Sequence, residues 1–305
     1  MMDKLTIDRR QILALAGILG TAGIRTVVAQ GSMPRRRIPG TDESLPVIGL
    51  GSSKVVSEIA SNGTAPLGAV LRELVANGGS VIDTWPRDAS NDAAFGTVIN
   101  EPDLRDALWV TTKIDQTGRD NGIAQFETTL RNYGREQIDL AQIFSLTDVD
   151  THWPSLRSFK DDGRARYIGV TVAAANLYDA LEAFLSRETP DFVQVNYSIT
   201  ERESETRLLP MLADRGIGVI INRPFMNGSY FDRLENDPLP DWTSEFDCTT
   251  WAQFSLKYIL SNPNLTCVLT ETSNPAHMRE NAQSAFGPLP DAAARQRMRD
   301  FIDAL

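Results

Sequence analysis

The sequence predicts an α/β fold, in which eight parallel strands and their helices form a single-domain (β/α)8 TIM barrel after an N-terminal signal segment. Short apolar runs alternate with segments whose apolar residues recur at helical spacing, and this alternation is typical of parallel strands joined by right-handed crossovers. Eight such runs within about 270 residues match the size of this barrel. A doubly wound sheet alternates in the same way, but the Gly49-Leu50-Gly51 turn lacks the third glycine and the acidic residue of a dinucleotide fingerprint.

Each expected strand is a short run rich in Val, Ile and Leu, and most of these runs end in a polar residue. In chain order the expected strands are residues 47–50, 80–83, 108–113, 138–144, 167–171, 192–196, 218–222 and 266–269. The first expected helix, 66–76, places Leu67, Val70 and Leu74 on one face, as an amphipathic helix packed on a sheet does. The same spacing predicts helices at 123–130, 177–184, 205–212 and 251–259.

The spacing breaks once, between the seventh and eighth expected strands. Residues 224–249 hold three prolines and several acidic residues. We interpret this segment as a lid-like insertion over the barrel mouth, and its alternative is a disordered surface insertion. Four aromatic side chains favour the packed lid, namely Phe225, Tyr230, Phe231 and Trp242.

Residues 1–29 have the order of a signal peptide, so we assign the barrel to residues 30–305. Arg9 and Arg10 precede an apolar stretch at 12–24, and small residues follow at 27–29. The paired arginines predict export through the twin-arginine route to a periplasmic or extracellular location, although Asp8 stands where that signal usually has Ser or Thr. The alternative is an amphipathic helix packed on the domain. The apolar stretch is too short for a stable membrane span, so we expect none in the mature chain.

Composition excludes several classes of function. The net charge of −10 argues against nucleic acid as a partner, because phosphate-binding surfaces are basic. The basic cluster, Arg35 to Arg37, is interpreted as a solvated segment. Two histidines and two cysteines leave too few ligands for a His and Cys zinc site, so no metal is expected. Pairing of Cys248 with Cys267 is left open.

In such barrels the chemistry lies at the carboxyl ends of the strands. Asp83 and Lys113 end neighbouring expected strands, so we expect their side chains to meet. Two interpretations stay open: an ion pair that only stabilises the barrel mouth, and a catalytic pair. The other strand ends contribute Phe144, Thr171, Asn196, Asn222, Thr270 and Glu271.

Eight motifs in chain order carry a resemblance to a known family. They are PVIGLG at 46–51, VIDT at 81–84, LWVTTK at 108–113, IDLAQI at 138–143, GRARYIGVT at 163–171, FVQVNYS at 192–198, RGIGVIINRPF at 215–225 and CVLTETSNPAHMRENA at 267–282. Together they resemble the aldo/keto reductases over residues 45–285. That resemblance implies carbonyl reduction with NAD(P)H, in which a tyrosine gives the proton, a lysine held by an aspartate lowers the tyrosine's pKa, and a histidine orients the carbonyl.

The resemblance matches Asp83 to the aspartate and Lys113 to the lysine, but the other two catalytic positions differ. Asp88 stands at the tyrosine position and Phe144 at the histidine position. An aspartate near a lysine is ionised at neutral pH, so it has no proton to give and carries the wrong charge for a developing alkoxide. Two other residues are candidate proton donors, His152 and Tyr197. We interpret His152 as a helix-entry residue.

The resemblance also implies a site for nicotinamide dinucleotide. The implied contacts are Thr171 and Gln194 for the carboxamide, Asn222 and Arg223 for the nicotinamide and pyrophosphate, Thr272 for a phosphate, and Glu280 and Asn281 for the adenine. Glu271 and His277 stand where the family often has a Lys and an Arg for the 2′-phosphate of NADP. The choice between NAD and NADP therefore stays open. The alternative is an inherited scaffold that binds nothing.

These observations predict a monomeric NAD(P)(H)-dependent oxidoreductase of the aldo/keto reductase type, acting on a small carbonyl or alcohol substrate with an altered or weakened active site. The alternative is a catalytically lapsed barrel that binds a nucleotide or another small ligand. A hydrolase that uses Asp83, Asp88 and Glu271 as paired acids is a third interpretation. It is the weakest, because Lys113 would keep both neighbouring aspartates ionised.

Overall fold

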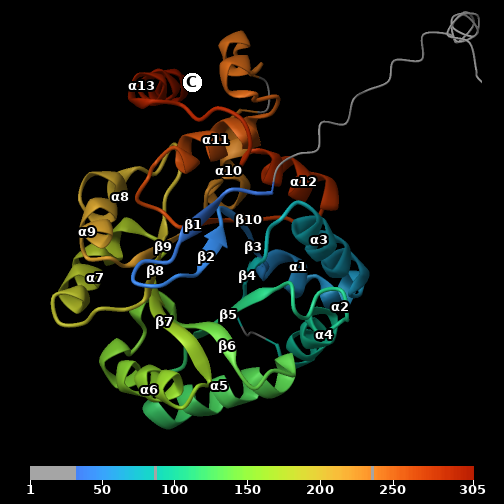
Figure 1. Ribbon diagram of the computed structural model, residues 1–305, viewed down its shortest axis with the longest axis vertical. Helices are drawn as coiled ribbons and strands as arrows, with labels where there is room; N and C mark the ends of the chain where they lie inside the picture. Colours follow the sequence, from blue (N-terminus) through green and yellow to red (C-terminus); the bar gives the residue numbers. More distant parts are fainter. Residues whose placement is uncertain (1–31, 86–87, 235–236) are drawn as a thin grey trace, which may run out of the picture. The chain divides into compact units, whose positions relative to one another are not determined.

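The computed structural model describes residues 32–85, 88–234 and 237–305. Eight parallel strands close into a barrel in chain order, and the last strand pairs with the first, which confirms the predicted (β/α)8 fold (Figure 1). The barrel strands are β3 (Ile48–Gly51), β4 (Val81–Asp83), β5 (Trp109–Ile114), β6 (Ile138–Ile143), β7 (Ala165–Thr171), β8 (Phe192–Asn196), β9 (Gly218–Asn222) and β10 (Cys267–Glu271).

Helices surround the barrel, and most of them bury one apolar stripe. In α3 (Ala65–Ala76) the stripe is the expected one, and Leu67, Val70 and Leu74 are fully buried. The other helices of the outer layer are α4 (Ala89–Ile99), α5 (Arg119–Tyr133), α6 (Val149–Asp161), α7 (Tyr178–Leu185), α9 (Leu208–Asp214), α11 (Trp251–Leu260) and α12 (Pro275–Gln283). Shorter helices lie between them: α1 (Ser53–Ser57), α2 (Ile59–Asn62), α8 (Glu203–Thr206) and α10 (Ser229–Arg233).

Helices α4 and α5 pack without room for a side chain at one point of their contact. A Cβ atom at Gly96 of α4 would lie 1.9 Å from the carbonyl oxygen of Asn132 in α5. Glycine is therefore required there by the close approach of the two backbones.

A hairpin that the sequence did not predict covers the amino-terminal end of the barrel. Strands β1 (Arg35–Arg37) and β2 (Ser44–Pro46) pair antiparallel, and Ile38 and Leu45 pack with barrel residues such as Trp109 and Phe192 (Figure 1). The interpretation of the basic cluster as a solvated segment is wrong for Arg36. Its guanidinium is half-buried and donates to the carbonyl oxygens of Asn262 and Leu265 at 2.9 and 2.7 Å.

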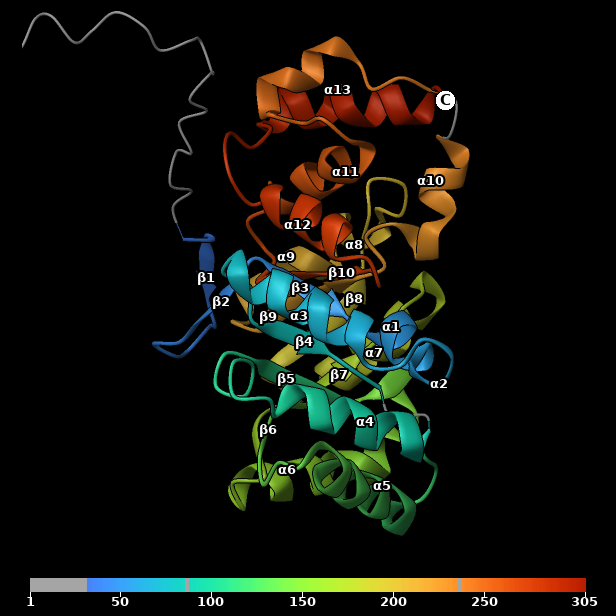
Figure 2. The ribbon, with the colours of Figure 1, turned by 90° about the vertical axis from the view of Figure 1, so that its right-hand side faces the viewer.

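A C-terminal helix also went unpredicted. Helix α13 (Ala292–Asp303) lies outside α11 and α12 (Figure 2). Its Phe301 ring stacks on Trp251, and its Arg295 donates to the Tyr197 hydroxyl at 2.9 Å. The helix therefore covers apolar residues of α11 that would otherwise face water.

The segment expected to be a lid divides into two parts. Phe225 and Phe231 lie against each other near the barrel mouth, with ring centroids 4.9 Å apart. Trp242, in the short 3-10 helix Asp241–Phe246, instead packs edge-on against Phe254 and Phe301 of the helix layer. Only the first part of the segment is thus placed where a lid over the mouth would lie.

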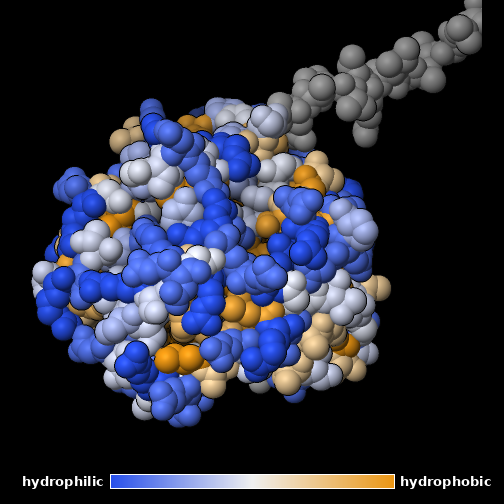
Figure 3. Space-filling view, turned by 60° about the horizontal axis from the view of Figure 1, so that its bottom comes forward, coloured by the Kyte–Doolittle hydropathy of each residue, from blue (hydrophilic) through white to orange (hydrophobic). Residues whose placement is uncertain are grey.

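The surface is largely polar and carries small apolar patches, as Figure 3 shows for one face. None of the helices in the described residues combines the length and the hydropathy that a membrane span requires. Both cysteines are buried and unpaired. The predicted signal segment, residues 1–29, lies outside the described residues.

Candidate active site

Asp83 and Lys113 form the ion pair that the sequence predicted. They come from the adjacent strands β4 and β5, and both side chains are at least nine-tenths buried. The Lys113 ammonium contacts Asp83 Oδ2 and donates to the Thr84 carbonyl oxygen at 3.1 Å. The Thr111 hydroxyl and the Gln142 amide donate to Asp83 Oδ1 at 2.5 and 3.3 Å. These bonds fix the carboxylate, and the carboxylate fixes the ammonium.

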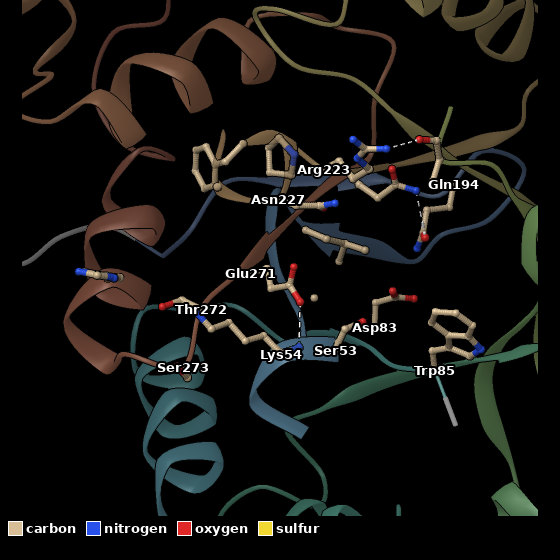
Figure 4. A pocket seen from close by; sticks show the side chains of 18 of the residues that line it. Ser53, Lys54, Asp83, Trp85, Gln194, Arg223, Asn227, Glu271, Thr272 and Ser273 are labelled. Carbon is tan, nitrogen blue, oxygen red and sulfur yellow. Dashed lines mark hydrogen bonds between the residues drawn. The ribbon is translucent and has the colours of Figure 1, made fainter. Parts of the chain in front are cut away.

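The pair lies at one end of a cavity of about 540 Å³ at the carboxyl ends of the strands. Asp83 and Trp85 line one side of this cavity, and Thr272 and Ser273 line the other (Figure 4). A cavity of this volume is of the size that holds a small-molecule ligand.

Asp88 is not part of this cavity. Its side chain begins α4 as the N-cap, and Oδ1 accepts from the backbone N–H groups of Ser90 and Asn91 at 3.0 and 2.9 Å. The carboxylate is exposed and borders a separate hollow of about 120 Å³. Its N-cap role accounts for a carboxylate at this position, because helix starts favour Asp.

Phe144 lies in the cavity wall and stacks on Trp85. The ring centroids are 4.1 Å apart at an interplanar angle of 23°. The Trp85 indole also donates to Asp115 Oδ2 at 2.8 Å. Where the family resemblance implied an imidazole, the structure has an apolar aromatic wall.

The two alternative proton donors lie elsewhere. His152 in α6 is fully buried, its Nε2 atom lies 2.6 Å from the Gln116 carbonyl oxygen, and its ring packs against Gly122. Tyr197 is buried beside Arg295, and burial raises the pKa of its phenol far above the usual range. Neither residue lines the cavity. The interpretation of His152 as a helix residue is confirmed.

Gln194 and Asn222 each have one unpaired amide atom beside the cavity. Asn222 Nδ2 donates to the Val172 carbonyl oxygen at 3.0 Å and to Gln194 Oε1 at 3.3 Å. Gln194 Nε2 and Asn222 Oδ1 are buried and have no partner among the described residues. Buried polar groups normally have partners, so a donor and an acceptor left open here fit a ligand that offers both. A primary carboxamide, such as that of nicotinamide, is such a ligand.

Arg223 adds a positive charge next to these amides. Its guanidinium donates to the Ala173 carbonyl oxygen at 2.8 Å and lies 3.8 Å from Glu201 Oε1. Its backbone has a φ of 53°, in the left-handed region that non-glycine residues seldom adopt. Such strain is found preferentially at functional sites.

The opposite end of the cavity is formed by the start of α12. Thr272, Ser273 and His277 line it, and Asn274 caps the helix by accepting from the Ala276 N–H at 2.9 Å. Glu271 and Lys54 lie between the two ends, and Glu271 Oε1 accepts from the Lys54 backbone N–H at 2.8 Å (Figure 4).

The cavity lining is more positive than the protein as a whole. The lining contains three basic residues, Lys54, Lys113 and Arg223, and two acidic residues, Asp83 and Glu271. The whole chain, in contrast, carries a net charge of −10. Such a lining suits an anionic ligand, because a cleft concentrates the field of its charges.

Three residues expected to bind the cofactor do not line the cavity. Thr171 is buried, and its hydroxyl accepts from the Ser145 N–H at 3.2 Å. The Glu280 carboxylate accepts from the Thr250 hydroxyl at 2.5 Å, and Asn281 is buried in α12. The expected residues that do line it are Gln194, Asn222, Arg223, Thr272 and His277.

Some residues that line the cavity were not predicted from the sequence; they lie just after strands or in the long segment that follows β9. Lys54 and Trp85 follow strands closely, so the rule that barrel chemistry lies at strand ends could have found them. Asn227 and Phe231 come from the long segment after β9. No periodicity in that segment indicates which of its side chains face the mouth.

Comparison with known proteins agrees with the fold. A model of the aldo/keto reductase family matches residues 47–297. The NADH-specific methylglyoxal reductase of Escherichia coli K12 is 27% identical over 196 residues, which cover 51% of this chain and 58% of that protein. The chain thus matches less than two thirds of that relative's length.

Solved structures show the same fold. The holo form of an aldo-keto reductase from Bacillus halodurans has a TM-score of 0.70 at 20% identity, covering 88% of this chain and 96% of that one. An aldo-keto reductase from Klebsiella pneumoniae in complex with NADPH also has a TM-score of 0.70 at 20% identity, covering 87% and 93%.

Proposed function

The chain belongs to the aldo/keto reductase family, and from this premise we propose that it is an NAD(P)(H)-dependent oxidoreductase acting on a small carbonyl or alcohol. The observation that carries the proposal is the composition of one cavity. It joins the buried Asp83–Lys113 pair to the open amide groups of Gln194 and Asn222. The ion pair suits a reacting oxygen, and the two amides suit the carboxamide of nicotinamide.

The chain's residues fit such a cofactor along the length of the cavity. Gln194 and Asn222 would hold the carboxamide, Arg223 would face the negative pyrophosphate, and the start of α12 with Thr272 would offer N–H and hydroxyl groups to phosphate oxygens. When bound, the reduced cofactor supplies a hydride.

For the cofactor we propose a preference for NADH over NADPH. Glu271 lines the cavity between its two ends, and a carboxylate accepts from a ribose hydroxyl but repels a phosphate. The Escherichia coli relative is described as NADH-specific, whereas the Klebsiella pneumoniae structure holds NADPH. In this protein the Glu271 side chain supports a preference for NADH.

A second candidate is a barrel that binds the nucleotide without turnover. The Trp85–Phe144 stack favours it, because aromatic rings occupy the wall where the family resemblance implied a histidine. Asp88 supports it as well, since the carboxylate at the tyrosine position caps a helix outside the cavity.

Titration of the chain from residue 30 with NADH and with NADPH, followed by nicotinamide fluorescence, tests both candidates. Binding of NADH together with its oxidation by members of a panel of small carbonyls supports the oxidoreductase. Binding without turnover on any carbonyl supports the second candidate. If neither nucleotide binds, both are wrong.

We also propose export of the folded protein by the twin-arginine route, on the evidence of Arg9, Arg10 and the apolar stretch that follows. This route suits a protein that acquires its nucleotide before export. Replacement of both arginines by lysine should leave the full-length protein in the cytoplasm of a bacterial host, as measured by cell fractionation. Periplasmic recovery of that variant at the wild-type level would contradict the proposal.

A further inference from the structure

The cavity lacks the phenol from which the family resemblance would draw the proton. Among the described residues that line it, none is a tyrosine, and its one histidine, His277, is on α12 at the end opposite Asp83. Asp88 is engaged as a helix cap, and His152 and Tyr197 lie outside. A carbonyl reduced here therefore needs another donor.

Lys113 is the donor that the geometry supplies. Its ammonium has three N–H groups, of which one contacts Asp83 and one donates to the Thr84 carbonyl oxygen. The third has no partner among the described residues, and the residue lines the cavity. Asp83 and Thr84 therefore hold the ammonium of a residue that borders the ligand space.

We propose that Lys113 binds the substrate's carbonyl oxygen directly and transfers a proton to it, so that no tyrosine is needed. This rests on the proposed function, because the reductant is a reduced nicotinamide dinucleotide. The carbonyl carbon receives a hydride, the C=O double bond becomes a single bond, and the oxygen takes the proton from Nζ. The alcohol leaves, and water returns a proton to the neutral amine.

Elementary acid–base chemistry agrees with this role. In water a lysine ammonium titrates near ~10.4 and a tyrosine phenol near ~10, so the two are acids of similar strength. The ammonium also carries a positive charge, which stabilises the negative oxygen that develops during hydride addition. An aspartate offers neither property.

Asp83 acts in this scheme as a positioning residue. Its carboxylate is fixed by the Thr111 hydroxyl and the Gln142 amide, and it fixes the ammonium in turn. The Trp85–Phe144 stack forms an apolar wall beside the pair, which excludes water and strengthens the interaction of the ammonium with a partly negative oxygen.

The first experiment measures binding without turnover. Acetate is the probe, because its carboxylate resembles an oxygen that carries negative charge. We expect Lys113→Met to weaken acetate binding to the cofactor-free protein by roughly 10- to 100-fold, measured by calorimetry. Lys160→Met is the matched control, since Lys160 also pairs with an aspartate, Asp191, but is on the outer surface. Equal acetate affinity in wild type and Lys113→Met would overturn the proposal.

The second experiment restores the donor from solution. Lys113→Ala should lose roughly 10²- to 10⁴-fold in carbonyl reduction. Ethylammonium should restore part of this activity, because it fits the space that the side chain leaves. Tetramethylammonium, which carries the charge without an N–H group, should not. Lys113→Met leaves no such space and should not respond to either amine.

Both variants leave Asp83 without its buried partner, so each is also made with Asp83→Asn, which removes the unpaired charge. Circular dichroism and NADH affinity show whether the variants fold. If the wild type binds acetate through Lys113 but binds no nicotinamide nucleotide, the proposed function fails while the oxygen-binding role of Lys113 stands. If the wild type reduces carbonyls and tetramethylammonium restores Lys113→Ala as well as ethylammonium does, the proton transfer is wrong.

Discussion

Phe144 stacks on Trp85 at a centroid separation of 4.1 Å, and this contact forms an aromatic wall beside the Asp83–Lys113 pair. Trp85 follows β4 and Phe144 follows β6, so the stack spans the mouth from one side of β5 to the other. The wall is anchored by the bond from the Trp85 indole to Asp115. Because the wall lies beside the ammonium, we expect it to limit the size of a substrate bound there.

Removing one ring of this stack should widen the substrate range. In Phe144→Ala we expect kcat/KM to rise for bulky carbonyls relative to the smallest ones, because the truncated side chain vacates space in the wall. The loss of the ring pair should also cost about 0.5–1.5 kcal/mol of unfolding free energy beyond the lost burial. Kinetics on a graded series of ketones and urea unfolding measure the two effects. An unchanged ratio of bulky to small substrates would show that the stack does not border the substrate.

Asp88 should affect stability and not turnover. In Asp88→Ala the N–H groups of Ser90 and Asn91 lose their acceptor, so we expect a loss of about 0.5–2 kcal/mol in unfolding free energy. Asp88→Asn keeps a capping oxygen and should be near wild type. Urea unfolding and steady-state kinetics of the folded variants measure this. A large loss of kcat in Asp88→Asn, with stability retained, would place the carboxylate in the chemistry after all.

The fold could be predicted from the sequence because its signals are local and repeated. Each short apolar run marks a strand, and the eight runs match the eight strands of the closed barrel. The hairpin before β3 escaped prediction because its two strands have three residues each, too short for a period-2 pattern. Helix α13 follows the last strand, beyond the expected alternation of strands and helices.

The site was predicted best where strand geometry or a family motif determines it. Asp83, Lys113, Gln194 and Asn222 are on barrel strands, and all four line the cavity. Thr171 also ends a strand, yet its hydroxyl is turned to the Ser145 N–H, because the chain after β6 enters the left-handed region there. Side-chain direction at such a position depends on tertiary contacts that a single sequence does not show.

Gln194 should contribute to cofactor affinity through its open amide. Gln194→Leu removes the donor that would meet the nicotinamide carboxamide, so we expect NADH to bind roughly 5- to 150-fold more weakly. ADP-ribose, which lacks the nicotinamide, is the matched ligand and should bind both proteins equally. Fluorescence titration with NADH and calorimetry with ADP-ribose measure these affinities. Equal losses for the two ligands would show that the substitution disturbs the whole cavity and not one contact.

Glu271 should set the preference between the two nucleotides. In Glu271→Gln the charge that repels a 2′-phosphate is gone, while the amide oxygen can still accept from the Lys54 backbone N–H. We expect the ratio of NADPH to NADH affinity to rise roughly two- to fivefold, since one partly solvated charge contributes at most about 1 kcal/mol. The effect should shrink as salt is raised, because the Debye length falls from about 10 Å at 0.1 M to about 3 Å at 1 M.

A control separates this local effect from the change in net charge. Glu245 on the surface pairs with Arg297 and lies outside the cavity, so Glu245→Gln removes the same charge elsewhere. We expect its NADPH to NADH ratio to equal that of the wild type at every salt concentration, measured by fluorescence titration. If Glu271→Gln leaves the ratio unchanged as well, the 2′-position of the bound ribose does not face Glu271. The adenosine end of the nucleotide would then have to lie further along α12, towards His277, where an imidazole replaces the carboxylate as the neighbouring group.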